Sequence, residues 1–213
     1  MCQFFSALAL RNGQVLCHPM LDSHSDLVTY FKLPDGAQWH QHFAKVELVP
    51  VDWMDVSTWE FTLDDETEPG WWNDVAGNVE SSMRAKADAM ILRSGKHRLI
   101  VDGCWIVGGN AIVTDVRGGR ILRVQDSAQI RDVQDSAQIR GVWDSAQIRD
   151  VGGWAQILGV WGSAQIHGVR DSAQILDVQD SAQIRDVQDS AQIRDVRDSA
   201  ILDGSARAHV AVA

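Results

Sequence analysis

Residues 178–195 read VQDSAQIRDVQDSAQIRD, two consecutive copies of one nine-residue unit. The unit, V-x-D-S-A-Q-I-x-D, recurs between Val107 and Asp203 as eleven copies, of which the first is looser and two are one residue short. A short tandem repeat of this kind sets the architecture of the segment that carries it. The fold of the C-terminal half therefore has to be derived from this period.

The period of nine fits strands and not a helix. At about 100° per residue, successive copies would point to opposite sides of an α-helix. In a strand, the Ala and Ile of each S-A-Q-I-R stretch lie on one face, and Ser, Gln and Arg lie on the other. The remaining residues form a turn, because Asp is exchanged there for Gly, and both tolerate left-handed backbone. The exchanged positions are Gly141, Gly153, Gly159, Gly162 and Gly168.

One strand and one turn per copy predict a parallel all-β solenoid over residues 106–213, with two copies, or about 18 residues, in each coil. The units resemble nonapeptide β-roll repeats. Eleven copies give between five and six coils, and a rod roughly 25 Å long at about 4.8 Å per coil. The core is expected to be narrow and filled by Ala, Ile and Val. A three-sided coil is the alternative.

The repeat is not expected to bind calcium. Calcium-binding nonapeptides resemble G-G-x-G-x-D-x-U-x, whereas most of those glycines are absent here and Asp is freely replaced by Gly. From residue 106 onward there are 14 Asp and 11 Arg, a near balance that indicates Asp in turns and Arg beside it. We predict no cofactor and no metal for this protein.

Departures from the unit predict a binding surface. Trp143 and Trp161 are 18 residues apart and would stack on adjacent coils; Trp154 replaces Ser; Leu158 and Leu176 replace Arg. Apolar side chains at polar positions often mark an interface. The alternative is that the N-terminal domain or a local twist covers them. The predicted binding residues are these five together with the arginines of one face, Arg131, Arg149 and Arg185.

The tail GSARAHVAVA, from Gly204, carries alternating small apolar residues and no cap. Solenoids normally protect their open ends. The tail therefore predicts a homodimer through the C-terminal end of the solenoid, with a frayed last strand as the alternative.

Residues 1–105 lack the repeat and differ in composition, since they contain all the Lys, Glu, Phe and Tyr residues of the chain. We predict a small α+β head module that caps the first coil. Asn12-Gly13 indicates a hairpin turn, and Ser-x-x-Asp at Ser23–Asp26 a capping box. The expected strands are 3–10, 14–18, 43–49, 58–63 and 97–101, and the expected helices run from Ser23 to about Phe31 and from the 69–74 segment to Ser94.

The head resembles a known group of proteins in several segments. The segments MCQFFSALALRNG, DSHSDLV, KVELVP, DDETEPGWW and DGCWIVGGNAIV resemble a head module of uncharacterised phage and bacterial proteins, which starts M-C-x-F-F-S-A and precedes variable short repeats. The resemblance covers about the first 115 residues. It implies a phage or bacterial cytoplasmic setting, and it assigns no activity to the head.

Two chemical alternatives concern the head. Cys2 would become N-terminal after removal of Met1, and with His24 could form the nucleophile and base of a small hydrolase or transferase. The second alternative is a zinc site, in which His40 and His42 would point the same way if the chain is extended. Its candidate ligands are Cys17, His18, His24, His40 and His42. The Trp residues at 39, 53, 59, 71, 72 and 105 could line a pocket, although large aromatic residues more often fill the core.

Composition excludes several function classes. The formal net charge of −10 opposes attraction to a phosphate backbone. We see no apolar run long enough to span a membrane and no secretion signal, and three scattered cysteines point to a reducing cytoplasm. The sequence thus predicts a non-enzymatic binding or scaffold protein that acts through its solenoid surface.

Overall fold

The computed structural model describes residues 5–34, 36, 39–65, 67–203 and 209–212. The chain divides into two compact units, Met1–Met90 and Ile91–Ala213, here called the head and the solenoid. They correspond to the α+β and the parallel all-β parts that the sequence predicts. Cys2 and the tail residues 204–208 lie outside the described residues.

The head is built on a four-stranded antiparallel sheet with the order β2-β1-β3-β4. Asn12-Gly13 closes the β1–β2 hairpin, with Gly13 at a φ of 82°. This φ favours glycine. The strands are β1 (Phe5–Leu10), β2 (Val15–Leu16), β3 (Phe43–Val49) and β4 (Glu60–Leu63).

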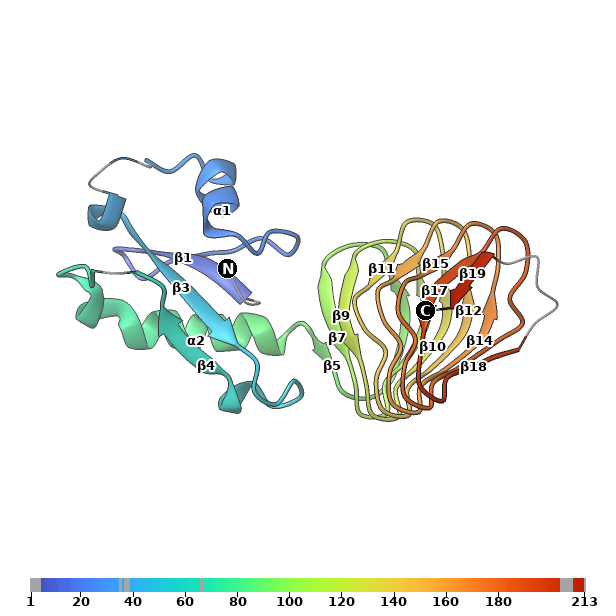
Figure 1. The fold of residues 1–213 in the computed structure, drawn as a ribbon. Coiled ribbons are helices and arrows are strands. Elements are labelled where there is room, and N and C mark those ends of the chain that lie inside the picture. Colours follow the sequence, from blue (N-terminus) through green and yellow to red (C-terminus); the bar gives the residue numbers. More distant parts are fainter. Residues whose placement is uncertain (1–4, 35, 37–38, 66, 204–208, 213) are drawn as a thin grey trace. The chain divides into compact units, whose positions relative to one another are not determined.

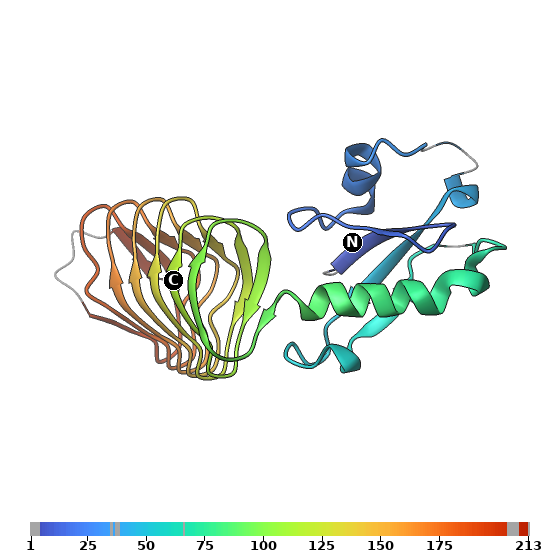
Figure 2. The same cartoon turned by 180° about the vertical axis from the view of Figure 1, so that it is seen from behind.

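Two helices and two short 3₁₀ turns complete the head: α1 (His24–Tyr30), η1 (Trp39–Gln41), η2 (Val56–Thr58) and α2 (Trp72–Asp88). Leu27 and Val28 of α1 pack on Leu8 and Phe43 of the sheet, and α2 lies on the sheet's other side (Figures 1 and 2). The expected capping box is wrong: Ser23 makes no cap hydrogen bond, and its hydroxyl lies 2.7 Å from that of Ser25 instead.

The solenoid consists of two parallel sheets, as predicted, and the chain alternates between them. Gln129 pairs with Gln147 and Gln138 with Gln156, so one coil takes 18 residues. The seven-stranded sheet contains β6 (Lys96–Ile100), β8 (Ile112–Val116), β10 (Gln129–Val133), β12 (Gln147–Val151), β14 (Gln165–Val169), β16 (Gln183–Arg185) and β18 (Ile201–Asp203).

The eight-stranded sheet lies on the other side of the core. Its outer strands are β5 and β19, and its register is carried by the paired glutamines and isoleucines of successive coils. It contains β5 (Ile91–Leu92), β7 (Cys104–Val107), β9 (Arg120–Val124), β11 (Gln138–Ile139), β13 (Gln156–Ile157), β15 (Gln174–Ile175), β17 (Gln192–Val196) and β19 (His209–Val212).

The solenoid begins at Ile91, earlier than the boundary near residue 105 that the repeat indicates. Strands β5 and β6 pair in parallel with β7 and β8 and so form the first coil without matching the unit. The 97–101 strand therefore belongs to the solenoid, and α2 ends at Asp88 instead of continuing to Ser94.

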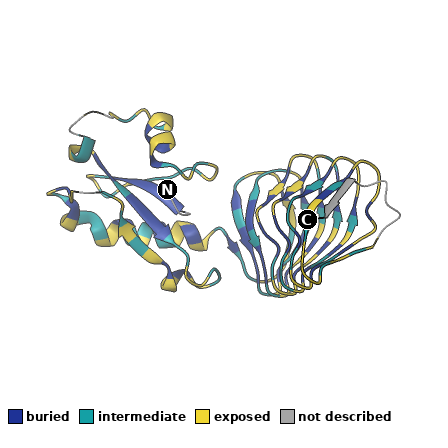
Figure 3. Ribbon diagram, in the orientation of Figure 1, coloured by how far each residue is buried: buried dark blue, intermediate teal, exposed yellow. Residues whose placement is uncertain are grey.

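The solenoid core is a continuous column of Ala, Ile and Val, as predicted. From Ala128 to Ile193 these inward residues are between 0 and 3% exposed, and Figure 3 shows buried positions alternating with exposed ones along the strands. Because Ala occupies one inward position of each copy, the two sheets enclose a thin apolar interior.

The turns explain the Asp-to-Gly exchange at the third position of the unit, which Gly153 and Gly162 occupy, but not at the ninth position, where Gly141, Gly159 and Gly168 have no positive φ. The third residue of each regular copy has a positive φ, for example 59° at Asp126 and 61° at Asp171, and Gly153 and Gly162 fill the same place with 65° and 70°. Asp171 also accepts a hydrogen bond from the Gly153 backbone N–H, 18 residues earlier, at 2.9 Å. The Asp column thus satisfies backbone donors of the preceding coil.

Candidate functional site

An apolar group interrupts the polar outer face of the eight-stranded sheet. Trp154 is 74% exposed and Leu158 is 44% exposed. Leu158 directly follows β13, and Trp154 lies in the turn that precedes it. The neighbouring Ala155 and Ile157 are fully buried, whereas both of these apolar side chains face solvent. Leu176 lies one coil further along the same column, because Gln156 pairs with Gln174. The exposed apolar surface that the sequence predicts is therefore present on this sheet.

Arginines flank this apolar column. Arg140 precedes Leu158 by one coil and Arg194 follows Leu176 by one coil. Arg194 also donates a hydrogen bond to the Gln192 side chain at 2.8 Å. A small hollow of about 50 Å³, lined in part by Arg140 and Leu158, lies beside the column. The surface offers an apolar strip with basic ends.

Trp143 and Trp161 stack on adjacent coils, as predicted, with ring centroids 4.2 Å apart. Both are half-buried. They replace polar residues at the turn that follows the eight-stranded sheet. Gly141 and Gly159 make room for them, since a Cβ at either glycine would collide with the tryptophan rings. This pair is a packed element of the corner, unlike the exposed Trp154.

The Trp stack continues to Arg123, whose guanidinium lies 4.4 Å from the centroid of the Trp143 ring. A cation over an aromatic face is attracted to it. Burial lowers the pKa of Arg123, and the carboxylates of Asp144 and Asp126 act in the opposite direction. Three coils are thus joined on this corner by side chains that depart from the unit.

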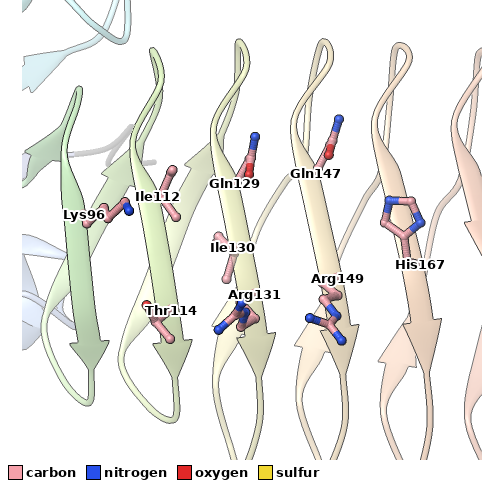
Figure 4. Close-up of a pocket in the computed structure, with 9 residues that line it drawn as sticks. All are labelled: Lys96, Ile112, Thr114, Gln129, Ile130, Arg131, Gln147, Arg149 and His167. Atoms are coloured by element: carbon pink, nitrogen blue, oxygen red, sulfur yellow. The ribbon is translucent and has the colours of Figure 1, made fainter.

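The seven-stranded sheet carries a basic groove of about 650 Å³ (Figure 4). Arg131, Arg149 and His167 lie on the successive strands β10, β12 and β14, and Lys96 lies on β6. The side chain of Arg149 also pairs with Asp150 at 3.4 Å. Arg185 occupies the next place of this column, where it donates to Gln183 at 2.8 Å. Charge of one sign along a groove suits an acidic ligand.

The head does not bring the predicted zinc ligands together as a set. Among the described residues, the group of three or more potential ligands is His24 with Glu47 and Asp64. His40 lies in the 3₁₀ turn η1 and not in an extended segment, while the His18 Nδ1 accepts from the Met20 N–H at 3.2 Å. Of the sequence candidates, His24 belongs to the cluster.

His24 is buried and held by two neighbours. Its Nε2 lies 3.1 Å from the Val46 carbonyl oxygen, and its Nδ1 lies 3.2 Å from Asp64 Oδ2. Because Cys2 is outside the described residues, the Cys2–His24 pair remains an untested expectation. Glu47 and Asp64 were missed by sequence reasoning. A glutamate inside the apolar strand FAKVELV was the signal for the first, and the acidic run 64–68 contained the second.

The described thiols are not members of this cluster. Neither Cys17 nor Cys104 forms a disulfide bond within the described part of the chain. Burial raises the pKa of Cys17, with the nearby Lys86 acting weakly in the other direction, which disfavours the thiolate that a nucleophile requires.

The head tryptophans mainly serve packing. Trp59 and Trp72 are buried at 1% and 6% exposure, and Phe61 stacks on Trp72 with centroids 6.1 Å apart. The Trp59 indole N–H donates to the Asp52 carbonyl at 2.6 Å. These contacts match the expectation of aromatic core residues better than a ligand pocket.

Comparison of the chain with protein-family models, with curated proteins and with solved structures gives no significant match. No described helix combines the length and the apolar character needed to cross a bilayer.

Proposed function

We propose that this protein is a non-enzymatic binding protein that holds a protein partner on the outer face of its solenoid. The observation that carries the proposal is the exposed apolar group of Trp154 and Leu158 at positions where the unit has Ser and Arg. A tryptophan that is 74% exposed contributes little to the packing of the coil, whereas aromatic anchors supply much of the binding free energy at interfaces.

The partner surface is expected to be apolar with acidic flanks. Arg140 and Arg194 lie at the two ends of the Leu158–Leu176 column, and complementary charge favours acidic residues opposite them. On the other sheet, Arg131, Arg149 and Arg185 form a basic column, which we propose as a second contact for an acidic segment of a protein.

The proposal also includes self-association through the C-terminal end of the solenoid and a bacterial or phage-infected cytoplasm. Self-association is supported by the position of β18 and β19, which are the last strands of their sheets among the described residues. The bacterial or phage-infected cytoplasm is supported by the family resemblance of the head segments and by the small number of scattered cysteines.

Restoring the unit tests the proposal without threatening the fold. Trp154→Ser and Leu158→Arg introduce residues that Ser172 and Arg140 already provide at equivalent places. A photo-crosslinking residue at position 154, with one at the exposed Ser163, the equivalent place half a coil away, as the matched control, first captures the partner in bacterial cells. The captured protein is then purified, and its Kd is measured against the wild-type chain and the double variant.

We expect the double variant to bind the partner at least about tenfold more weakly, which corresponds to a loss of about 1.4 kcal/mol. Equal affinity for the two proteins would contradict the proposal. A crosslink between two copies at position 154 would instead assign this face to self-association, and capture at neither position would leave the apolar group without a binding role.

A further inference from the structure

Three separate segments of the head converge on one point. His24 begins α1, Glu47 lies in the middle of β3, and Asp64 follows β4. One potential ligand atom of each residue lies within 4.8 Å of the other two. The antiparallel register places Glu47 opposite Thr62, and Asp64 donates its backbone N–H to the Lys45 carbonyl at 2.8 Å. The sheet itself therefore fixes the positions of both carboxylate residues.

The hydrogen bonds of His24 define which ring nitrogen faces the cluster. A backbone carbonyl only accepts, so the Nε2 that lies 3.1 Å from the Val46 oxygen carries a proton. In the neutral imidazole, Nδ1 then presents its lone pair toward Asp64 Oδ2 at 3.2 Å. A metal ion bound to both atoms satisfies this contact, as a proton on Nδ1 would. Histidine ligands of metals are commonly oriented by such a backbone carbonyl on the other nitrogen.

Glu47 gives an independent indication of a cation. The residue is 7% exposed, and its Oε1 has no hydrogen-bond partner. A buried carboxylate is costly unless it is paired or binds a metal. Ser6, which lies opposite Glu47 on β1, directs its hydroxyl to the Asp22 carbonyl at 2.8 Å. The ammonium of Lys45, on the same face of β3, lies 4.3 Å from the centroid of the Trp39 ring.

We propose that His24, Glu47 and Asp64 bind a divalent transition-metal ion, for which Zn²⁺ is the ion that one imidazole and two carboxylates favour. Ligand atoms at about 2.0–2.2 Å from zinc lie no more than about 4.4 Å apart. A small movement of Asp64, whose side chain is 53% exposed, closes the site onto the ion and also provides its path of entry. Three protein ligands leave the fourth position of a tetrahedral ion to water.

The test uses the full chain without an affinity tag. Binding of Zn²⁺ is measured by calorimetry, and the ring nitrogens of His24 are followed by ¹H–¹⁵N NMR during the titration. Glu47→Gln and Asp64→Asn remove one ligand each, and Asp64 is exposed enough for its variant to fold. Glu60→Gln removes an exposed carboxylate of the adjacent strand β4 and is the matched control.

We expect one Zn²⁺ per chain, a selective shift of the His24 Nδ1 resonance, and affinities at least about tenfold weaker in the two ligand variants. Glu60→Gln should bind as the wild type does. The proposal is overturned if His24 Nδ1 does not respond to millimolar Zn²⁺. It is equally overturned if Glu47→Gln and Asp64→Asn bind zinc as well as the wild type, because the ion would then occupy another site.

Discussion

Individual residues explain how a near-identical repeat stacks in register. Where the third residue of the unit is Asp, it can combine a left-handed backbone with a carboxylate that accepts the N–H of the preceding coil, as Asp180 does from Gly162 at 2.9 Å. Gly adopts the left-handed backbone but has no carboxylate to accept the N–H, and Ala neither favours that backbone nor accepts the N–H. This double role accounts for a position that exchanges Asp with Gly and, in the described copies, with no other residue.

The residue-scale prediction concerns Asp171, at a φ of 61°. Asp171→Ala should lower the free energy of unfolding by about 1–2 kcal/mol, because Ala disfavours the left-handed region and loses the bond to Gly153. Asp171→Gly should cost less, and Asp171→Asn should remain close to the wild type. Urea unfolding followed by far-UV circular dichroism provides the comparison. An Asn variant as unstable as the Ala variant would show that the carboxylate charge, and not the turn geometry, stabilises the coil.

At the scale of elements, the repeat predicts the strands that lie within its copies but not the strands of the first coil, which precede them. Alternation within S-A-Q-I-R places Ala and Ile inside, and the structure confirms this in each regular coil. The first coil was not predicted because the sequences of β5 and β6 do not match the repeat unit. These two strands join the sheets through backbone pairing with β7 and β8. The cluster of His24, Glu47 and Asp64 was not predicted for a related reason. The pairing of β3 with β4 brings the two carboxylates together, and the packing of α1 on the sheet adds His24.

The alternation between sheets makes a sharp prediction for deletions. Removing residues 151–159 deletes one copy, so Trp161 would follow Trp143 by half a coil and lie at the opposite corner. The solenoid should fold, because the copies on both sheets share one unit, but the Trp–Trp stack should be lost. Near-UV circular dichroism reports the coupling of the two indoles, whose centroids lie 4.2 Å apart.

A deletion of two copies provides the control for this experiment. Removing residues 178–195 takes out one complete coil and leaves Trp143 and Trp161 on adjacent coils. The indole signal should persist in that variant. Its loss there, or its survival after removal of residues 151–159, would be incompatible with a coil of two copies.

At the scale of the whole molecule, the repeat array leaves a sheet edge that other chains can use. Among the described residues, β18 and β19 have a strand on one side only. Such edges expose unpaired backbone N–H and C=O groups and invite pairing with a second chain. Ile201 of β18 is 53% exposed and departs from the Gln of the unit, which favours an apolar contact at this end.

We therefore expect a homodimer in solution through these terminal strands. Light scattering after size exclusion should give twice the chain mass of 23.6 kDa, and a chain ending at Asp203, which lacks β19, should be monomeric. Ile201→Lys should also give a monomer, because a charge on an edge strand opposes pairing. Gln183→Lys, one strand inward in the same column, should remain a dimer. If all four proteins are dimers, the terminal strands are not the interface, and the apolar column of Leu158 and Leu176 becomes the remaining surface for association. If all four are monomers, the homodimer prediction is wrong.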